Sequence, residues 1–462
     1  MKKSLIFIII FIKYINAIYA CGYYPYGEDI RFSLFGPEYF DYQEFKDFFY
    51  NANIIGSNDN PNTYYQSNVY DWYSFINQEV SIDEINECLN YLKFTDIDSS
   101  STNQFVKYLF NNNLHKIIKY LKVAKKSEDF STVYNADPWE RNDSLRRNYS
   151  SLLAELNKHI ADEEDDYFKR KYAFLCIRSA YYCGSFTLIY NLFHKYFEKG
   201  KRDYLYYWAS YFNLFNNPHP SVDMANIMAY STEKRYACYF YFHNQFKLER
   251  DLLKAKSSND LANLYAFASV QRLDPNLEYL KIIYNNCAKS RILDFLLLRE
   301  INKIEDWVYT PYYTNYLPST TYSVNWNSNL HYTKLSTEAL RARSEKDRLY
   351  AKKVLEFINS VNYDKIRDIS LWKAAKIQLL FITRKYTDCL KEIEYFERQY
   401  SNDRIFKQIE KIKVLCIVSH QKTGTTIINE EVKSIILGNL LDEHFCLRWE
   451  ESLSTEAIFL TA

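Results

Sequence analysis

The chain has little glycine and proline, and it has no excess of charge of either sign. Only 8 Gly and 9 Pro occur among its 462 residues. Large all-β and doubly wound α/β domains need glycine at tight turns and phosphate loops, so this composition argues against both classes. The 58 basic and 57 acidic side chains give a formal charge of +1. This balance excludes a generally basic nucleic-acid binder, because no surplus of Lys or Arg attracts phosphate over a whole face.

Sequence motifs for metal ions, cofactors and nucleotides are also missing. The nine cysteines form no CxxC pair, and the eight histidines form no HxxxH or HExxH pattern. Neither GxGxxG nor a Walker A sequence occurs. We therefore predict no catalytic residue, no cofactor and no metal site.

Three fragments match the short motifs of a serine acyl-transferase in the right order. They are Ser231-Thr232-Glu233-Lys234, Tyr400-Ser401-Asn402 and Lys422-Thr423-Gly424. In that fold the last motif lies on a sheet strand, whereas here it joins two helical patterns. We therefore interpret the matches as coincidental.

Aromatic side chains are what the chain has in abundance, with 45 Tyr and 31 Phe. The hydrophobic content of 47% excludes a mostly disordered chain. A buried Tyr needs a partner for its hydroxyl group, so many of these rings should lie at the edge of the core or on the surface. The class that remains is an all-α chain with an aromatic core.

Residues 1–20 have the features of a secretory signal. Two lysines precede an unbroken apolar run from Leu5 to Ile12. This run is far shorter than the roughly 20 residues that span a bilayer, so it indicates a cleaved signal and not an anchor. The sequence Ile-Tyr-Ala-Cys that ends at Cys21 resembles a bacterial lipobox, which would place a lipid on Cys21. Cleavage by an ordinary signal peptidase would leave Cys21 as a free thiol, and either route predicts a protein of the periplasm or the outer membrane.

The segment after the signal predicts an extended arm that packs on helices. Residues 21–56 hold four of the eight glycines. Ile30, Phe32 and Leu34 alternate with polar residues, which is a short strand pattern, and the pattern ends at a Gly36-Pro37 turn. We divide the mature chain into an arm with loops at 21–80, a helical-hairpin domain at 81–309, an aromatic and polar loop or linker at 310–336, and a C-terminal helical domain at 337–462.

Two segments share one helical pattern at a constant offset of 200 residues. Ile177 precedes a break at Gly184, and Ile377 precedes a break near Arg384, with apolar residues at helical spacing on both sides of each break. Each segment predicts two antiparallel helices joined by a tight turn, which resembles the hairpin of the tetratricopeptide (TPR) repeat. The expected fold is therefore an α-solenoid of TPR-like helical hairpins that carries a short extended N-terminal arm.

A cluster of rings at 307–326 is the predicted interaction surface. Rings on a surface can stack on sugar faces or anchor a protein partner. Alternatively, the rings fill the seam between two helical halves. The residues of this set are Trp307, Tyr309, Tyr312, Tyr313, Tyr316, Tyr322 and Trp326.

The chain also resembles a family of uncharacterised exported helical proteins from Bacteroidetes-type bacteria. The resemblance lies in the Cys-Gly-Tyr-Tyr-Pro-Tyr-Gly start at residues 21–27 and in the segment from Asp306-Trp307 to Pro311-Tyr312-Tyr313. It implies export and a helical fold, and it implies no activity.

Three functions are compatible with these patterns. The first is a non-catalytic scaffold that binds protein partners at the cell envelope, held to the membrane only through a lipid. The second is a glycan-binding surface lipoprotein, similar in broad plan to the SusD-type nutrient-uptake proteins, which are also exported, helical and TPR-bearing. The third is a polysaccharide-degrading enzyme on an α/α toroid, which requires a closed ring of helices and two facing carboxylates.

Overall fold

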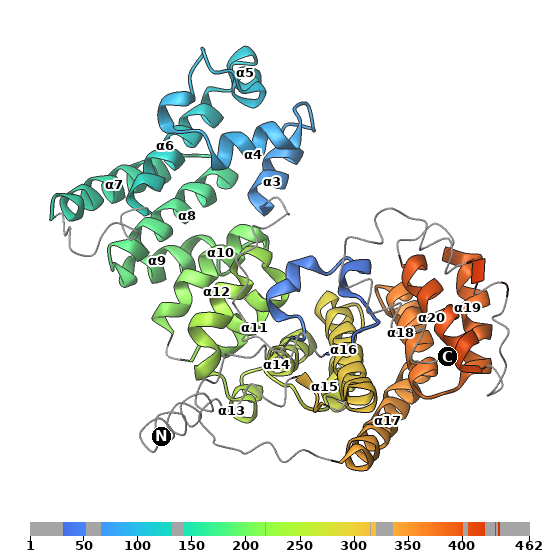
Figure 1. Cartoon of the computed structure of the whole chain (residues 1–462). Coiled ribbons are helices and arrows are strands. Elements are labelled where there is room, and N and C mark those ends of the chain that lie inside the picture. Colours follow the sequence, from blue (N-terminus) through green and yellow to red (C-terminus); the bar gives the residue numbers. More distant parts are fainter. Residues whose placement is uncertain are drawn as a thin grey trace, which may run out of the picture.

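A computed structural model describes most of the chain (Figure 1). The described residues are 31–51, 66–131, 143–217, 219–314, 316–319, 336–400, 405–420, 430 and 433–434. Residues 1–20, Cys21, Tyr322 and Trp326 lie outside this set, so the predicted signal, lipid site and part of the predicted ring surface do too.

Every regular element among the described residues is a helix, which confirms the all-α class. The 3₁₀ helices are η1 (Pro37–Tyr39), η2 (Gln43–Phe48), η3 (Phe94–Asp96), η5 (Leu214–Asn216), η6 (His243–Gln245) and η8 (Tyr363–Lys365). The α-helices are α3 (Ser67–Phe75), α4 (Ile82–Asn90), α5 (Gln104–Asn111), α6 (His115–Ser131), α7 (Asp143–Asp162), α8 (Asp166–Tyr182), α9 (Phe186–Tyr196), α10 (Tyr204–Asn213), α11 (Ser221–Tyr230), α12 (Thr232–Phe242), α13 (Leu248–Leu252), α14 (Ser258–Val270), α15 (Leu277–Cys287), α16 (Arg291–Tyr313), α17 (Thr337–Ser360), α18 (Ile369–Ile382), α19 (Tyr386–Tyr400) and α20 (Phe406–His420).

The helices pack mainly on their neighbours in the sequence. Within this order, one row of helices runs through the molecule, in which α6, α8, α10, α11, α14, α16, α18 and α20 contact one another in turn. Helix α5 and helix α19 lie at opposite ends of the array in Figure 1. The core is therefore a long band of buried side chains that follows the row.

The two hairpins expected from the sequence pattern are present and use the same turn. α8 and α9 contact each other, as do α18 and α19. The amide of Ser185 donates to the carbonyl of Ala180 at 2.8 Å, and the amide of Lys385 donates to that of Leu380 at 2.9 Å. The residue before each donor, Gly184 or Arg384, has a positive φ. Both turns are thus helix ends of the Schellman type, in which a left-handed residue lets the chain reverse.

Two of the predicted boundaries differ from the structure. The helical part begins at Ser67, in α3, and not near residue 81. At the other boundary, α16 continues through Pro311 to Tyr313, so residues 310–313 are helix and not loop. A proline removes one backbone hydrogen bond, but α16 is buried along nearly its whole length. This burial holds the helix through the proline.

Candidate functional site

The N-terminal arm, residues 31–51, contains an extended stretch whose backbone is bound by side chains of distant helices. The amides of Leu34 and Phe35 donate to the Glu305 carboxyl on α16, at 3.1 and 3.0 Å. Gln378 on α18 donates to the same carboxyl group. Glu305 is fully buried, and this burial raises its pKa to about 8. At neutral pH, most folded molecules therefore carry a proton on this carboxyl group.

Two amide side chains complete the hold on this stretch. The Gln408 side chain, on α20, donates to the carbonyl of Leu34 at 2.7 Å and accepts from the amide of Gly36 at 3.1 Å. The Asn302 side chain, on α16, donates to the carbonyl of Phe35 at 2.7 Å. These contacts provide hydrogen-bond partners for the backbone groups of the extended chain, as a neighbouring strand does in a sheet. The predicted arm is therefore present, but its partners are helix side chains and it forms no strand.

The arm continues across α16 toward α12. The ring of Phe45 stacks on Phe295 of α16 with centroids 4.6 Å apart. The Arg299 side chain donates to the carbonyl of Phe48 at 3.0 Å, and Arg235 of α12 donates to the carbonyl of Glu44 at 2.6 Å. Residues 31–51 thus connect α12, α16, α18 and α20, which appear as neighbours of the blue segment in Figure 1.

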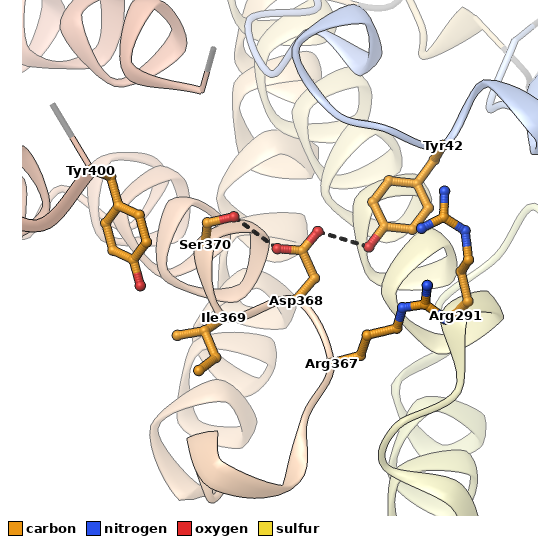
Figure 2. Close-up of a pocket in the computed structure, with 7 residues that line it drawn as sticks. All are labelled: Tyr42, Arg291, Arg367, Asp368, Ile369, Ser370 and Tyr400. Carbon is orange, nitrogen blue, oxygen red and sulfur yellow. Dashed lines mark hydrogen bonds between the residues drawn. The ribbon is translucent and has the colours of Figure 1, made fainter. Parts of the chain in front are cut away.

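A pocket of about 410 Å³ opens beside the arm, where α16 begins, α18 begins and α19 ends (Figure 2). Asp368 caps α18, because its carboxylate accepts from the amide of Leu371 at 3.0 Å. The Tyr42 hydroxyl donates to the other carboxylate oxygen at 2.9 Å. Figure 2 shows Tyr42 and Tyr400 on opposite sides of Asp368. The residues that line the pocket are Tyr42, Arg291, Arg367, Asp368, Ile369, Ser370 and Tyr400.

The two arginines of the pocket differ in their partners. Arg291 binds the Glu44 carboxylate and lies over the Tyr42 ring, 4.9 Å from its centroid. Arg367 is exposed, and it makes no hydrogen bond or ion pair with any residue in the described ranges. The pocket therefore offers one guanidinium group for a negatively charged or strongly polar ligand.

A second carboxyl group lies behind the pocket. Asp294 is fully buried, and one of its oxygens accepts from the Trp372 indole at 2.7 Å. Burial raises the pKa of Asp294 to about 7, and the charge of Asp368 acts in the same direction. Asp294 is thus a partly protonated group of the core and is out of reach of a ligand.

The pocket contains no activated nucleophile. The Ser370 hydroxyl donates to Asp368 at 2.8 Å, but the same carboxylate also serves Tyr42 and the helix cap. A carboxylate that is engaged in this way is a weak base, and no histidine lines the pocket. The arrangement can bind a ligand, but it lacks the groups that would activate one.

Two of the predicted surface rings belong to the core, so their assignment to an interaction surface is wrong. Trp307 and Tyr309 are only 7% and 4% exposed. The Trp307 ring lies 6.0 Å from Tyr350 of α17, and the Tyr309 ring lies 6.3 Å from Phe381 of α18. These contacts fit the alternative, in which the rings fill the seam between the two helical halves, because α16 continues where a loop was expected.

The remaining described rings of that set lie at the edge of the molecule. Tyr312 and Tyr313 are half-buried, and Tyr316 is 38% exposed. The guanidinium groups of Arg341 and Arg384 lie over the Tyr312 ring, 5.6 and 5.9 Å from its centroid. The structure therefore divides the predicted surface into a buried part and a small outer part, which meet where the Tyr309 and Tyr313 rings lie 5.9 Å apart.

Sequence reasoning did not identify the pocket. One local signal exists, since Asp368 precedes Leu371 by three residues, which is typical of a helix start. Tyr42, however, reaches Asp368 across 326 positions of sequence. No local pattern predicts that contact.

The acyl-transferase fragments do not form a site in the described residues. Ser231 is buried at the start of α12. The ammonium of Lys234 lies over the rings of Trp208, Tyr211 and Phe212, at 5.3 to 5.5 Å. Tyr400 lies at the end of α19, and the rest of the fragments fall outside the described residues. The same residues contain no group of three His, Cys, Asp or Glu side chains that could hold a metal ion.

Comparisons with known proteins give no match. No family model matches the chain. Neither the curated proteins nor the solved structures contain a significant match to it. Among the described helices, none has the length and apolar character needed to cross a bilayer.

Proposed function

We propose that the chain is an exported, non-catalytic α-solenoid of TPR-like hairpins that binds a protein partner at the cell envelope. The contact row from α6 to α20 supports the solenoid, because each helix of the row contacts the next helix of the row. The repeated turn at Gly184 and Arg384 supports hairpins as the unit. No protein of known function contributes to this proposal.

The observation that carries the proposal is the way in which the helices hold residues 31–36. Glu305, Asn302 and Gln408 bind backbone groups of an extended chain. Backbone recognition of this kind binds a peptide with little regard to its sequence, while neighbouring pockets select side chains. The molecule thus already uses its helix surface to bind an extended polypeptide, which is its own arm.

The pocket at Arg367 is the proposed contact for the partner. It lies beside the arm, and its free guanidinium group fits an acidic side chain of a partner protein. The Tyr400 ring, which is partly exposed, lines the same pocket and can contact the partner. The partner would therefore bind next to the arm and would not need to displace it.

Cross-linking on intact cells that produce the full chain tests this proposal. The wild-type chain should capture a discrete protein partner, and Arg367→Glu should reduce the capture at least tenfold, because it places an acid opposite an acid. Arg398→Glu is the matched control, since Arg398 is an exposed arginine of α19 that does not line the pocket. Equal capture by all three chains, or none by the wild type, contradicts the proposal.

Export and lipidation belong to the same proposal and need their own test. Fractionation of cells should place the wild-type chain with the envelope membranes, and Cys21→Ser should release it into the soluble envelope fraction. A wild-type chain found in the cytoplasm would contradict the proposed location.

The toroid enzyme is the least supported alternative. It needs a closed helical ring, whereas α5 and α19 lie at opposite ends of the described array. It also needs two accessible carboxylates, and Asp294, which lies next to Asp368, is fully buried. We therefore keep the scaffold as the proposed function.

A further inference from the structure

Exposed aromatic side chains from three separate segments form one continuous surface at the end of α8, at η5 and at the end of α12. We call this the ring surface, and its members are Tyr181, Phe186, Phe215, Phe240 and Tyr241. Phe186, Phe240 and Tyr241 are 42%, 56% and 55% exposed. Rings with such exposure normally occur singly on a soluble protein, so a group of them is informative.

Successive contacts connect the rings. The Tyr181 ring lies 6.4 Å from Phe186 and 4.9 Å from Phe215. Phe215 lies 6.0 Å from Tyr241, and Tyr241 lies 5.2 Å from Phe240. The surface is therefore one strip of rings that crosses four elements, α8, α9, η5 and α12.

Buried rings beneath the strip support it. Phe212 lies 5.1 Å from Tyr181, and Phe242 lies 4.9 Å from Phe215. Both supporting residues are only 4% exposed. Because packed side chains keep single rotamers, the outer rings form a preformed platform.

The segments that build the strip lack charged side chains. Residues 179–194, 204–222 and 236–246 contain no Asp, Glu, Lys or Arg, although such residues make up 25% of the chain. The exposed residues of these segments, apart from the rings, carry mainly amide or hydroxyl groups; examples are Thr187, Asn191, Asn217, Asn244 and Gln245. These three segments therefore contribute no Asp, Glu, Lys or Arg with which to attract or orient a charged ligand.

One cation lies behind the strip. The ammonium of Lys234 is 5.5 Å from the centroids of Tyr211 and Phe212. Lys234 is half-buried, and burial lowers its pKa to about 8. It stays mostly protonated at neutral pH, but its charge lies against the supporting rings and not on the outer face.

We propose that the ring surface binds a neutral glycan chain. Sugar rings present apolar C–H faces that stack on aromatic rings, and hydroxyl edges that hydrogen-bond to amide and hydroxyl groups. The strip and the uncharged polar groups of its segments offer both. A protein interface also uses aromatic residues, but it is enriched in arginine as well and gains orientation from charges, and these segments contain no Asp, Glu, Lys or Arg.

This inference is independent of the proposed scaffold function. The ring surface lies on α8, α9, η5 and α12, whereas the pocket lies on α16, α18 and α19. A loss of glycan binding would leave partner capture at Arg367 unchanged, and the reverse also holds.

Affinity electrophoresis of the full chain tests the inference. Native gels would contain a dissolved neutral glucan, mannan or xylan, with heparin as the anionic comparison. The wild-type chain should be retarded in at least one neutral gel and not by heparin. The retardation should be the same in low and high salt, because no ion pair forms.

Variants of the exposed rings locate the site. Phe240→Ala and Tyr241→Ala should each weaken binding about 3- to 10-fold, as expected for the loss of one stacked ring. Tyr91→Ala is the matched control, because Tyr91 is 74% exposed on another part of the chain. Phe186→Ala is a third variant of the strip. Like Phe240, Tyr241 and Tyr91, Phe186 is exposed enough to be replaced without unfolding the chain.

Three results would overturn the inference. The first is that no neutral polysaccharide retards the wild-type chain. The second is that the ring variants bind as tightly as the wild type. The third is that the ring variants keep glycan binding and lose the cross-linked protein partner, which would assign the surface to a protein.

Discussion

Buried carboxyl groups determine how the arm is held. Burial raises the pKa of Glu305 to about 8 and that of Asp294 to about 7, and the charges of Arg31 and Arg367 offset only part of this effect. Asp306, also fully buried, accepts from the hydroxyl groups of Tyr50 and Thr310, each at 2.7 Å. These three carboxyl groups of α16 therefore act through hydrogen bonds, in contrast to Arg291, which forms an ion pair with Glu44 of the arm.

The raised pKa of Glu305 predicts a specific dependence of stability on pH. The folded chain keeps a proton on Glu305 up to about pH 8, whereas the unfolded chain releases it near its ordinary value of about 4.3. The contribution of this group to the free energy of unfolding should therefore fall as the pH rises from about 5 to about 8, and stay level above that. The expected slope is about 1.4 kcal/mol for each pH unit.

Glu305→Gln isolates this effect, because glutamine imitates the protonated acid and does not titrate. Urea unfolding of both chains at pH 5 to 9 would give the difference in unfolding free energy. The wild type should lose stability relative to the variant between pH 5 and 8. A difference that stays constant over this range would contradict the raised pKa.

The two hairpin turns show how an element depends on a single backbone angle. Gly184 has φ +76°, and a Cβ added there would meet no atom within 4 Å. Arg384 occupies the equivalent position with φ +60°. The same turn is therefore made by glycine in one hairpin and by a strained residue in the other.

We expect substitutions at these turns to act in opposite directions. Gly184→Ala should lower the unfolding free energy by about 1 kcal/mol, through φ and not through a clash. Arg384→Gly should be more stable than Arg384→Ala by about 1 kcal/mol, and both lose the same exposed ion pair to Glu345. Thermal unfolding of the three variants and the wild type measures this, and equal stability of Arg384→Gly and Arg384→Ala would show that φ carries no cost.

The arm predicts a local effect when one of its ligands is removed. Gln408 is fully buried and binds both Leu34 and Gly36. Gln408→Ala leaves two backbone groups unpaired and should cost about 2 to 4 kcal/mol. Hydrogen exchange at residues 31–36 should accelerate, with Gln399→Ala, an exposed change on α19, as the control. Unchanged exchange at the arm would contradict the proposed hold.

The sequence predicted the helices better than the contacts between distant parts of the chain. The hairpins at Gly184 and Arg384 follow from helical periodicity and a break, which are local properties. The arm was predicted, but its contacts and the pocket could not be, because Tyr42 and Asp368 meet across 326 positions. Trp307 was misplaced for another reason, since an aromatic segment beside Pro311 has the composition of a loop although burial keeps it helical.

The whole molecule combines a row of neighbours with one long-range connection. The helices from α3 to α8 contact mainly each other and α9 or α10. The arm, by contrast, joins α12, α16, α18 and α20 through side-chain contacts. The helices from α3 to α8 should therefore unfold separately. The helices that the arm connects should unfold together as a larger unit.

The central claim of this account is that the helices form an open array of neighbours and not one closed core. Hydrogen exchange of the full chain with Leu156→Ala tests it most directly, because Leu156 is fully buried in α7 and its truncation should cost about 2 to 5 kcal/mol. We predict that protection falls in α6 to α8 and is unchanged in α17 to α20, and that Ile412→Ala in α20 gives the reverse pattern. An equal loss of protection along the entire chain in both variants would contradict the account.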